Sequence, residues 1–156
     1  MDGRYSFANQ PEIAKWNLRS LMMALSPLIP MEKMEQNLAI YDKIYMRYFH
    51  YYMCKKLGFE GTVEGDPELI DDMLDMLESL QVDYTLFFRT LSHYESDRKA
   101  LLATGLYHEP MHAWLDRYDE RIKHIDKTER KKQMLSANPK YVLKNLSLIH
   151  ISEPTR

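Results

Sequence analysis

The spacing of apolar residues along this chain is helical almost throughout. Apolar positions recur at steps of three and four, the period of one face of an α-helix. No segment alternates strictly between apolar and polar residues, as a half-buried strand would. The pattern therefore predicts an all-α fold without a sheet. The predicted helices cover residues 11–25, 31–57, 66–80, 84–91, 97–103, 109–125, 128–136 and 139–145.

Local signals indicate where these helices begin and end. Pro11, Pro67 and Pro110 stand in predicted first turns, where the N–H that proline lacks would have no partner anyway. Asp83 is placed to cap the helix that follows it, and Gly58 is placed to end the helix before it. The inward faces predicted from the period are Ala14, Leu18, Leu21, Met22 and Leu25 in the first helix, Ile70, Met73, Leu74, Leu77 and Leu80 in the third, and Met111, Trp114, Leu115, Tyr118, Ile122 and Ile125 in the sixth.

The long helix predicted at residues 31–57 is rich in aromatic residues. A row of tyrosines can stack on the bases of a nucleic acid, but heptad-like spacing is more typical of a packing face whose hydroxyls reach the rim. We therefore expect a packing face, with a binding surface for another protein as the alternative. The recurring positions are Met34, Leu38, Tyr41, Tyr45, Tyr48 and Tyr52.

Composition narrows the class of protein. The chain has 156 residues, the size of one domain or part of one, and a formal net charge of −2. With a pI of about 6.3, it has no overall positive field that would draw it to nucleic acid or to anionic lipid. No apolar run approaches the roughly 20 residues of a membrane-spanning helix. We expect neither a nucleic acid nor a membrane as a partner.

Cys54 is the only cysteine, so an intrachain disulfide is impossible and a reducing compartment is favoured. The neighbouring Lys55 and Lys56 would lower the pKa of its thiol and make it reactive. A half-buried structural thiol is the preferred interpretation.

The sequence "HEPMH" at residues 108–112 matches the zinc motif H-E-x-x-H. That motif needs both histidines on one continuous helix, one turn apart. Pro110 disfavours helical geometry at Glu109 and fits the first turn of a helix that starts there. His108 then precedes the helix, so we expect a capping loop and no metal site.

Two charged runs have ordinary explanations. Residues 60–83 hold nine acidic residues and no Lys or Arg, and Asp71, Asp72 and Asp75 lie close together on one predicted helix. Clustered carboxylates can bind Mg²⁺ or Ca²⁺, but acids near a helix N-terminus are favoured by its dipole, and these lie opposite the apolar face. We expect a solvated face there, and also at residues 130–132, whose sequence Arg-Lys-Lys is a weak signal for nucleic acid.

A family resemblance begins near the start of the chain. The segment "GRYSFANQPEIAKWNLRSL" at residues 3–21 resembles the selenoprotein O family, known in bacteria as the YdiU or UPF0061 proteins. The likeness continues in the family's order with "KLGF" at 56–59, "DYTLFFRTLS" at 83–92, "WLDRYDERI" at 114–122 and "NPKYVLKN" at 138–145. It therefore covers roughly residues 3–145.

The resemblance implies that the parent protein has a protein-kinase-like fold. It also implies that this parent transfers AMP from ATP to Ser, Thr or Tyr hydroxyls of other proteins. Uridylyl transfer has also been attributed to bacterial members. Such chemistry needs a glycine-rich phosphate loop, Lys and Arg for charge, an Asp base, and Asn and Asp ligands for Mg²⁺ or Mn²⁺. In the family these groups precede the Gly-Arg-Tyr segment. We therefore expect no catalytic, ATP-binding or metal-binding residue in this chain.

The expected parts are a C-terminal helical region at residues 1–145, which would pack on the kinase-like core of a longer pseudokinase, and a non-native tail at 146–156. The tail "LSLIHISEPTR" matches the translation of a transposon-end adapter used in DNA sequencing libraries, and it resembles nothing in the family. ATP, the metal and the protein substrates would belong to the full-length parent, in the bacterial cytoplasm or in mitochondria. The alternative is a stand-alone helical interaction module.

Overall fold

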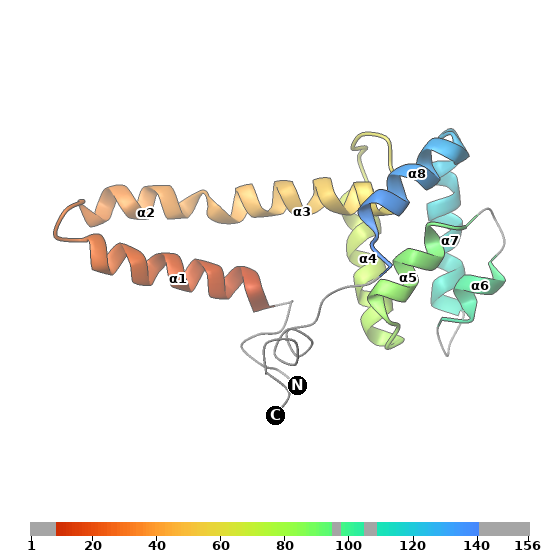
Figure 1. The fold of residues 1–156 in the computed structure, drawn as a ribbon, viewed down its shortest axis with the longest axis horizontal. Coiled ribbons are helices and arrows are strands. Elements are labelled where there is room, and N and C mark those ends of the chain that lie inside the picture. The colour runs from red at the N-terminus through yellow and green to blue at the C-terminus, as the bar shows by residue number, and fades with distance from the viewer. Residues whose placement is uncertain (1–8, 95–97, 105–108, 141–156) are drawn as a thin grey trace, which may run out of the picture. The chain divides into compact units, whose positions relative to one another are not determined.

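The computed structural model describes residues 9–94, 98–104 and 109–140, and within these ranges it contains helices and no strand. The all-α prediction is confirmed for them. No helix among them is both long and apolar enough to cross a membrane. The tail predicted at residues 146–156 lies outside the described ranges and stays a prediction. The helices are α1 (Gln10–Leu25), α2 (Met31–Ala39), α3 (Tyr41–Leu57), α4 (Asp66–Ser79), α5 (Tyr84–Leu91), α6 (Lys99–Leu102), α7 (Glu109–Ile122) and α8 (Lys127–Ala137) (Figure 1).

The chain divides into two compact units, a first unit at Met1–Phe49 and a second unit at His50–Arg156. In the first unit, α1 and α2 lie side by side and run in opposite directions (Figure 1). The Tyr41 hydroxyl donates a hydrogen bond of 3.1 Å to the Pro11 carbonyl, which ties the start of α3 to the start of α1. Lys15 and Asp42 form an ion pair of 2.5 Å between the same two helices.

The helix predicted over residues 31–57 is wrong as a single element, because α2 ends at Ala39 and α3 begins at Tyr41. Ile40 keeps helical backbone angles (φ −86°, ψ −7°). The hydrogen-bond ladder resumes at once, since the N–H of Ile44 donates to the carbonyl of Ile40 at 3.0 Å. Neither glycine nor proline marks this interruption, so the sequence carried no signal for it.

The aromatic packing face predicted for α3 is also wrong over most of its length. Tyr45, Tyr48 and Tyr52 are exposed, and Tyr52 keeps 58% of its surface in solvent. The buried residues of α3 are instead Met53, Cys54 and Leu57. Tyrosine, which has both a ring and a hydroxyl, suits a wet surface as well as a core. Its spacing therefore identifies a face of the helix but not what covers that face.

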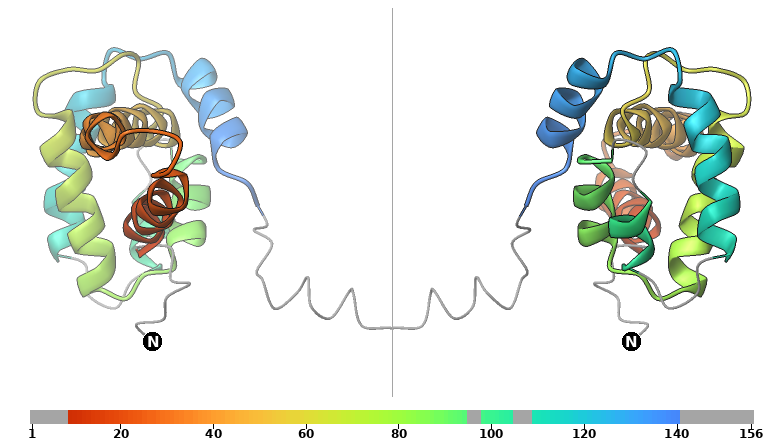
Figure 2. Two further views of the ribbon diagram at one scale, coloured as in Figure 1. Left: turned by 90° about the vertical axis from the view of Figure 1, so that its left-hand side faces the viewer. Right: turned by 90° about the vertical axis from the view of Figure 1, so that its right-hand side faces the viewer.

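The second unit has a well-filled core. In it α4 and α7 lie side by side (Figures 1 and 2), and Trp114 of α7 donates a 2.9 Å hydrogen bond from Nε1 to the Leu69 carbonyl of α4. Phe87 of α5 packs edge-on against the Trp114 ring at 5.9 Å. Most residues predicted to face inward are buried, whereas Leu74, Ile122 and Ile125 are half-buried. The confirmed ones are Ile70, Met73, Leu77, Leu80, Met111, Trp114, Leu115 and Tyr118.

Most predicted helix ends are confirmed to within a residue or two. Asp83 caps α5 by accepting a 2.7 Å hydrogen bond from the Leu86 N–H. The short helix predicted at 97–103 is found as α6, although residue 97 itself lies outside the described ranges. The helix predicted to start at Pro139 is wrong in its first two residues, which are not helical, and its remainder at 141–145 also lies outside those ranges.

Gly58 ends α3 as predicted, and it also sets how closely α8 approaches. Its φ of +73° is in the left-handed region that favours glycine. A Cβ at this position would lie 2.5 Å from Cγ of Arg130 and 2.8 Å from Cγ and Sδ of Met134, both on α8. The two helices therefore pack together only because this residue has no side chain.

We predict that Gly58→Ala lowers the stability of the second unit much more than Gly61→Ala does. Gly61 has a similar φ of +69°, but a Cβ added there would meet nothing within 4 Å. Each substitution costs about 1–2 kcal/mol for the left-handed backbone, and only Gly58→Ala adds about 1–3 kcal/mol for overpacking against α8.

Urea unfolding followed through Trp114 fluorescence measures this difference, in a Trp16→Phe background that silences the other tryptophan. Equal losses for the two variants would contradict the close approach of α8 at Gly58.

Candidate functional site

The first unit carries an apolar groove of about 370 Å³ between its helices. The predicted inward face of α1 lies here: Leu18, Leu21, Met22 and Leu25 all line the groove, and none of them is buried. The prediction of a buried stripe on α1 is therefore wrong in this structure, although the residues do share one face. The remaining lining residues are Ile29, Met34, Asn37, Leu38, Ile40, Tyr41 and Ile44.

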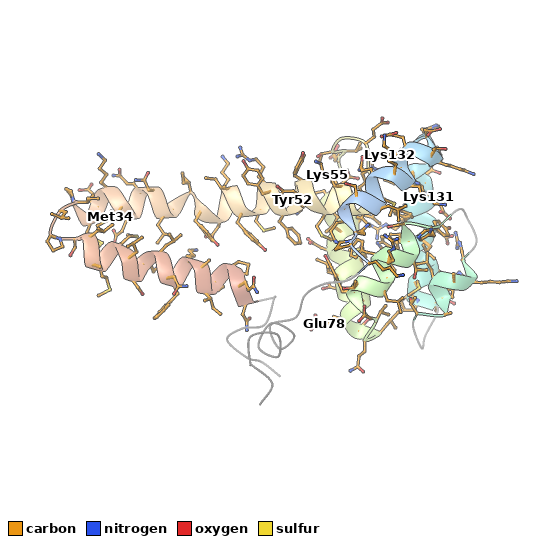
Figure 3. The ribbon with its side chains drawn as sticks, in the orientation of Figure 1. Met34, Tyr52, Lys55, Glu78, Lys131 and Lys132 are labelled. Carbon is orange, nitrogen blue, oxygen red and sulfur yellow. The ribbon has the colours of Figure 1, made fainter. Side chains whose placement is uncertain are left out.

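Among the described residues of the first unit, Met34 alone is buried. It lies on α2 near the turn that follows α1 (Figure 3). The groove is thus an open, mostly apolar surface, and Asn37 and Tyr41 are the lining residues with polar side-chain atoms. A surface of this kind is suited to bind an apolar partner, and the hydroxyl of its Tyr41 is hydrogen-bonded to the Pro11 carbonyl.

A small network of buried hydrogen bonds lies around Arg130 in the second unit. Its guanidinium donates one hydrogen bond to the Tyr118 hydroxyl at 3.1 Å and another to the Tyr94 carbonyl at 2.6 Å. The Tyr118 hydroxyl in turn donates to the carbonyl of Leu57 at 2.8 Å. Arg130 keeps 5% of its surface exposed and Tyr118 none. Burial raises the pKa of Tyr118 above its ordinary value.

The prediction of a solvated basic run at residues 130–132 is therefore wrong for its first member. Arg130 lies on the inner face of α8, where its long side chain spans from the helix to Tyr94 and Tyr118. Lys132 is exposed as predicted and pairs with Glu129 at 3.6 Å, and Figure 3 locates Lys131 and Lys132 on α8. Charge alone could not separate the three positions, whereas the helical period of α8 places Arg130 and Met134 on one face.

Two ion pairs link acidic residues of α4 to arginines of α7. Arg121 binds the carboxylate of Asp66 through Nε at 2.7 Å, and this carboxylate is buried. Asp66 also accepts from the Val63 N–H at 2.8 Å, so it orders the turn before α4. Asp72 pairs with Arg117 at the surface. Asp71, Asp72 and Asp75 are exposed, which confirms the solvated face predicted for them.

A third group of charges surrounds the end of the α5–α6 connection. The Tyr94 hydroxyl donates to the Asp119 carboxylate at 2.8 Å, and Arg98 pairs with Asp119 at 2.7 Å and with Asp116 at 2.8 Å. Burial, followed by the hydrogen bond to Asp119, raises the pKa of Tyr94 to about 12. These groups satisfy one another, so they hold α6 and α7 in register and present no unpaired base.

Of the two histidines of "HEPMH", the structure describes only His112, which lies on α7. α7 begins at Glu109, with Pro110 in its first turn, which confirms the predicted helix start. His112 lies with Nδ1 3.5 Å from the Arg98 guanidinium, and a cation is a poor neighbour for a metal site. His108 lies outside the described residues. Within the described ranges, no three His, Cys, Asp or Glu side chains are grouped so as to hold a metal ion.

Cys54 is buried in the second unit, deeper than the half-buried position predicted. Burial, together with the charge of Asp66, raises the pKa of its thiol. The suggestion that Lys55 and Lys56 lower the pKa of this thiol is therefore wrong, because the pKa is raised. Lys56 instead lies over the Phe88 ring at 4.7 Å, with its pKa lowered by burial, and Lys55 lies over the Tyr51 ring at 4.6 Å.

Asn138 is a residue whose role the sequence analysis missed. Its amide nitrogen donates to the Lys56 carbonyl at 2.8 Å and to the Ser92 hydroxyl at 3.1 Å, and Arg89 donates to its backbone carbonyl at 3.3 Å. It is buried and joins the end of α8 to the ends of α3 and α5. The sequence offered two signals, an Asn-Pro pair between two predicted helices and its place in the family-like segment at residues 138–145.

Comparison with known proteins gives a single consistent family. The model of the family described as protein adenylyltransferase SelO matches residues 1–155. The protein nucleotidyltransferase YdiU of Vibrio vulnificus strain CMCP6 is 39% identical over 153 residues, an alignment that covers 92% of this chain and 31% of the relative. The protein of the same name from Albidiferax ferrireducens is 41% identical over 155 residues, with 92% and 30% covered. The chain thus spans under a third of the length of these relatives.

We predict that Arg130→Met destabilises the second unit by about 2–3 kcal/mol, because the Tyr94 carbonyl and the Tyr118 hydroxyl lose a buried donor. Lys132→Met, on the same helix but exposed, should change stability by no more than about 0.5 kcal/mol. Urea unfolding monitored by Trp114 fluorescence compares the two, and a loss of similar size in both would contradict the buried role of Arg130.

We also predict a loss of stability at alkaline pH. Tyr94 and Tyr118 have raised pKa values in the folded chain, so folding disfavours their ionised forms. The stability that the two protonated hydroxyls add to the folded chain is complete below the ordinary tyrosine pKa of about 10. It is lost as the pH rises towards 12. Urea midpoints between pH 8 and 11.5, with tyrosinate absorbance at 295 nm, should show late ionisation coupled to unfolding.

Tyr94→Phe should weaken this alkaline loss of stability, whereas Tyr52→Phe, which alters an exposed tyrosine, should leave it unchanged. A Tyr94→Phe chain that lost stability with the same pH dependence as the wild type would rule out Tyr94 as a source of the effect.

Proposed function

Because this chain belongs to the SelO family, described as protein adenylyltransferases, we propose that it is the C-terminal helical part of an enzyme that transfers AMP from ATP to Ser, Thr or Tyr hydroxyls of other proteins. The observation that carries the proposal is the family match over residues 1–155, together with relatives named protein nucleotidyltransferase. Because the chain covers 31% of such a relative, the groups that handle ATP belong to the remaining part of the enzyme in this proposal.

The charged groups of the second unit are consistent with such a supporting part. Transfer of a nucleotide from Mg²⁺-bound ATP needs carboxylates free to hold metal and cations free to face phosphates. Among the described residues, no three His, Cys, Asp or Glu side chains are grouped so as to hold a metal ion. Two carboxylates are already paired, since Asp66 is bound by Arg121 and Asp119 by Arg98 and Tyr94. The second unit in this view supplies a rigid helical support, and Mg²⁺ or Mn²⁺ and ATP bind elsewhere in the enzyme.

A stand-alone helical interaction module is the second candidate. Tyr51 and Tyr52, which are both exposed, favour it, because tyrosine is enriched at protein interfaces. The two candidates differ in what they predict for a longer protein. An enzyme part restores transfer when it is joined to the rest of the enzyme, whereas a module would contribute nothing to transfer.

A chimera tests the proposal directly. Residues 1–145 of this chain replace the matching segment of the Vibrio vulnificus relative, and the purified chimera is incubated with a protein acceptor, Mg²⁺ or Mn²⁺, and ATP labelled at either the α- or the γ-phosphate. We expect label from α-labelled ATP and none from γ-labelled ATP, because transfer of AMP retains only the α-phosphate. UTP labelled at the α-phosphate tests uridylyl transfer in parallel.

The 156-residue chain alone is the matched control, and it should transfer no label. Transfer by this chain alone would contradict the placement of the catalytic groups outside it. A folded chimera without activity, next to an active relative, would contradict the assignment of this chain to the enzyme.

A further inference from the structure

The two units differ sharply in how much apolar surface they cover for themselves. The second unit buries a continuous core that includes Leu57, Phe87, Leu91, Leu115 and Tyr118. The first unit, among its described residues, buries only Met34 and leaves large apolar side chains in solvent. Chains of about 40 residues rarely build a stable core alone. The groove of the first unit is therefore an incomplete core.

We propose that this groove is the docking surface for an apolar helix face from the part of the enzyme that this chain does not contain. The inference rests on the proposed function, since it takes this chain to be part of a longer protein. It adds the specific surface through which the two parts meet. The lining of that surface includes Leu18, Leu21 and Leu25 of α1, Met34 and Leu38 of α2, and Ile44 of α3.

The length of the relatives indicates which polypeptide could occupy the groove, namely the part of the enzyme outside the aligned region. An alignment that covers 31% of the Vibrio vulnificus relative leaves more than twice the length of this chain outside it. A second unit that is already filled cannot use that remainder to complete its core, whereas the first unit needs such a cover. The remainder of the enzyme is thus the occupant whose presence the family match itself supports.

The lining specifies the chemistry of the occupant. It is aliphatic apart from Tyr41 and Asn37, and the ion pair of Lys15 with Asp42 joins α1 to α3 in the same unit. Two antiparallel helices with an apolar groove between them accept a third helix, which places side chains at steps of three and four into the groove. An amphipathic helix with Leu, Ile or Met at these steps fits; a charged segment does not.

The chain offers a matched pair of variants to test this. Leu21 and Met23 are both exposed residues of α1, at 53% and 70%, and only Leu21 lines the groove. In the isolated 156-residue chain, Leu21→Asp and Met23→Asp should have similarly small effects on hydrogen exchange. In the chimera, Leu21→Asp should speed exchange in α1 and α2 by about tenfold or more, because it uncovers a docked helix pair, and Met23→Asp should not.

Two controls compare hydrogen exchange between the chimera and the isolated chain. Wild-type α1 and α2 should exchange at least about tenfold more slowly in the chimera than in the isolated chain. Leu21→Met, which keeps the apolar volume, should behave as wild type in both. Equal effects of Leu21→Asp and Met23→Asp in the chimera would overturn the proposal.

Two other occupants would also overturn it. Sedimentation that shows a dimer of the isolated chain, dissociated by Leu21→Asp, would assign the groove to a second copy. Faster exchange of α1 and α2 after deletion of residues 141–156 would assign it to the chain's own tail. Nucleotide transfer by the wild-type chimera separates the two hypotheses. An active chimera in which Leu21→Asp does not speed exchange in α1 and α2 would contradict the docking surface alone. An inactive chimera in which Leu21→Asp does speed that exchange would contradict the proposed function alone.

Discussion

A fully buried tyrosine hydroxyl must be hydrogen-bonded inside the protein, and in the second unit this requirement joins four segments. Tyr118 on α7 donates to the Leu57 carbonyl at the end of α3 and accepts from Arg130 on α8. Arg130 uses its second nitrogen for the Tyr94 carbonyl after α5. A buried donor or acceptor left without a partner costs about 1–3 kcal/mol. The positions of α3, α5, α7 and α8 are therefore set together.

The aromatic packing around Tyr118 follows from the same constraint. Its ring stacks on Trp114 with centroids 5.0 Å apart and contacts Phe59 at 5.9 Å. Trp114 is itself fixed by its hydrogen bond to α4, so the polar and apolar contacts of α7 reinforce each other. Gly58 completes the arrangement, because only a residue without a side chain lets the Arg130 stem pass so close to the end of α3. The buried charges of Arg130 and Asp66 are thus used inside the second unit.

The sequence predicted most of the helices and the core faces of α4 and α7, because a strongly periodic apolar face leaves few alternatives for a helix beside a core. It failed where a residue type fits two environments. The tyrosines of α3 suit both solvent and core, and Arg130 resembles its lysine neighbours until α8 is packed against Tyr118. The interruption at Ile40 has no sequence signal at all. The burial of Asn138 depends on contacts between the ends of α8, α3 and α5, which are far apart in the chain. No local sequence pattern shows that these segments meet.

The contrast between the units bears on what each contributes to the proposed enzyme. Where charges pair with one another at short distances, as Asp66 does with Arg121, they are unavailable to a nucleotide and serve to hold helices in place. An open apolar face has the opposite property, since it gains free energy only when something covers it. The second unit is therefore suited to give the enzyme rigidity, and the first unit is suited to join it to the rest. A residue that is unimportant for the stability of the isolated chain, such as Leu21, is then expected to matter most in the assembled protein.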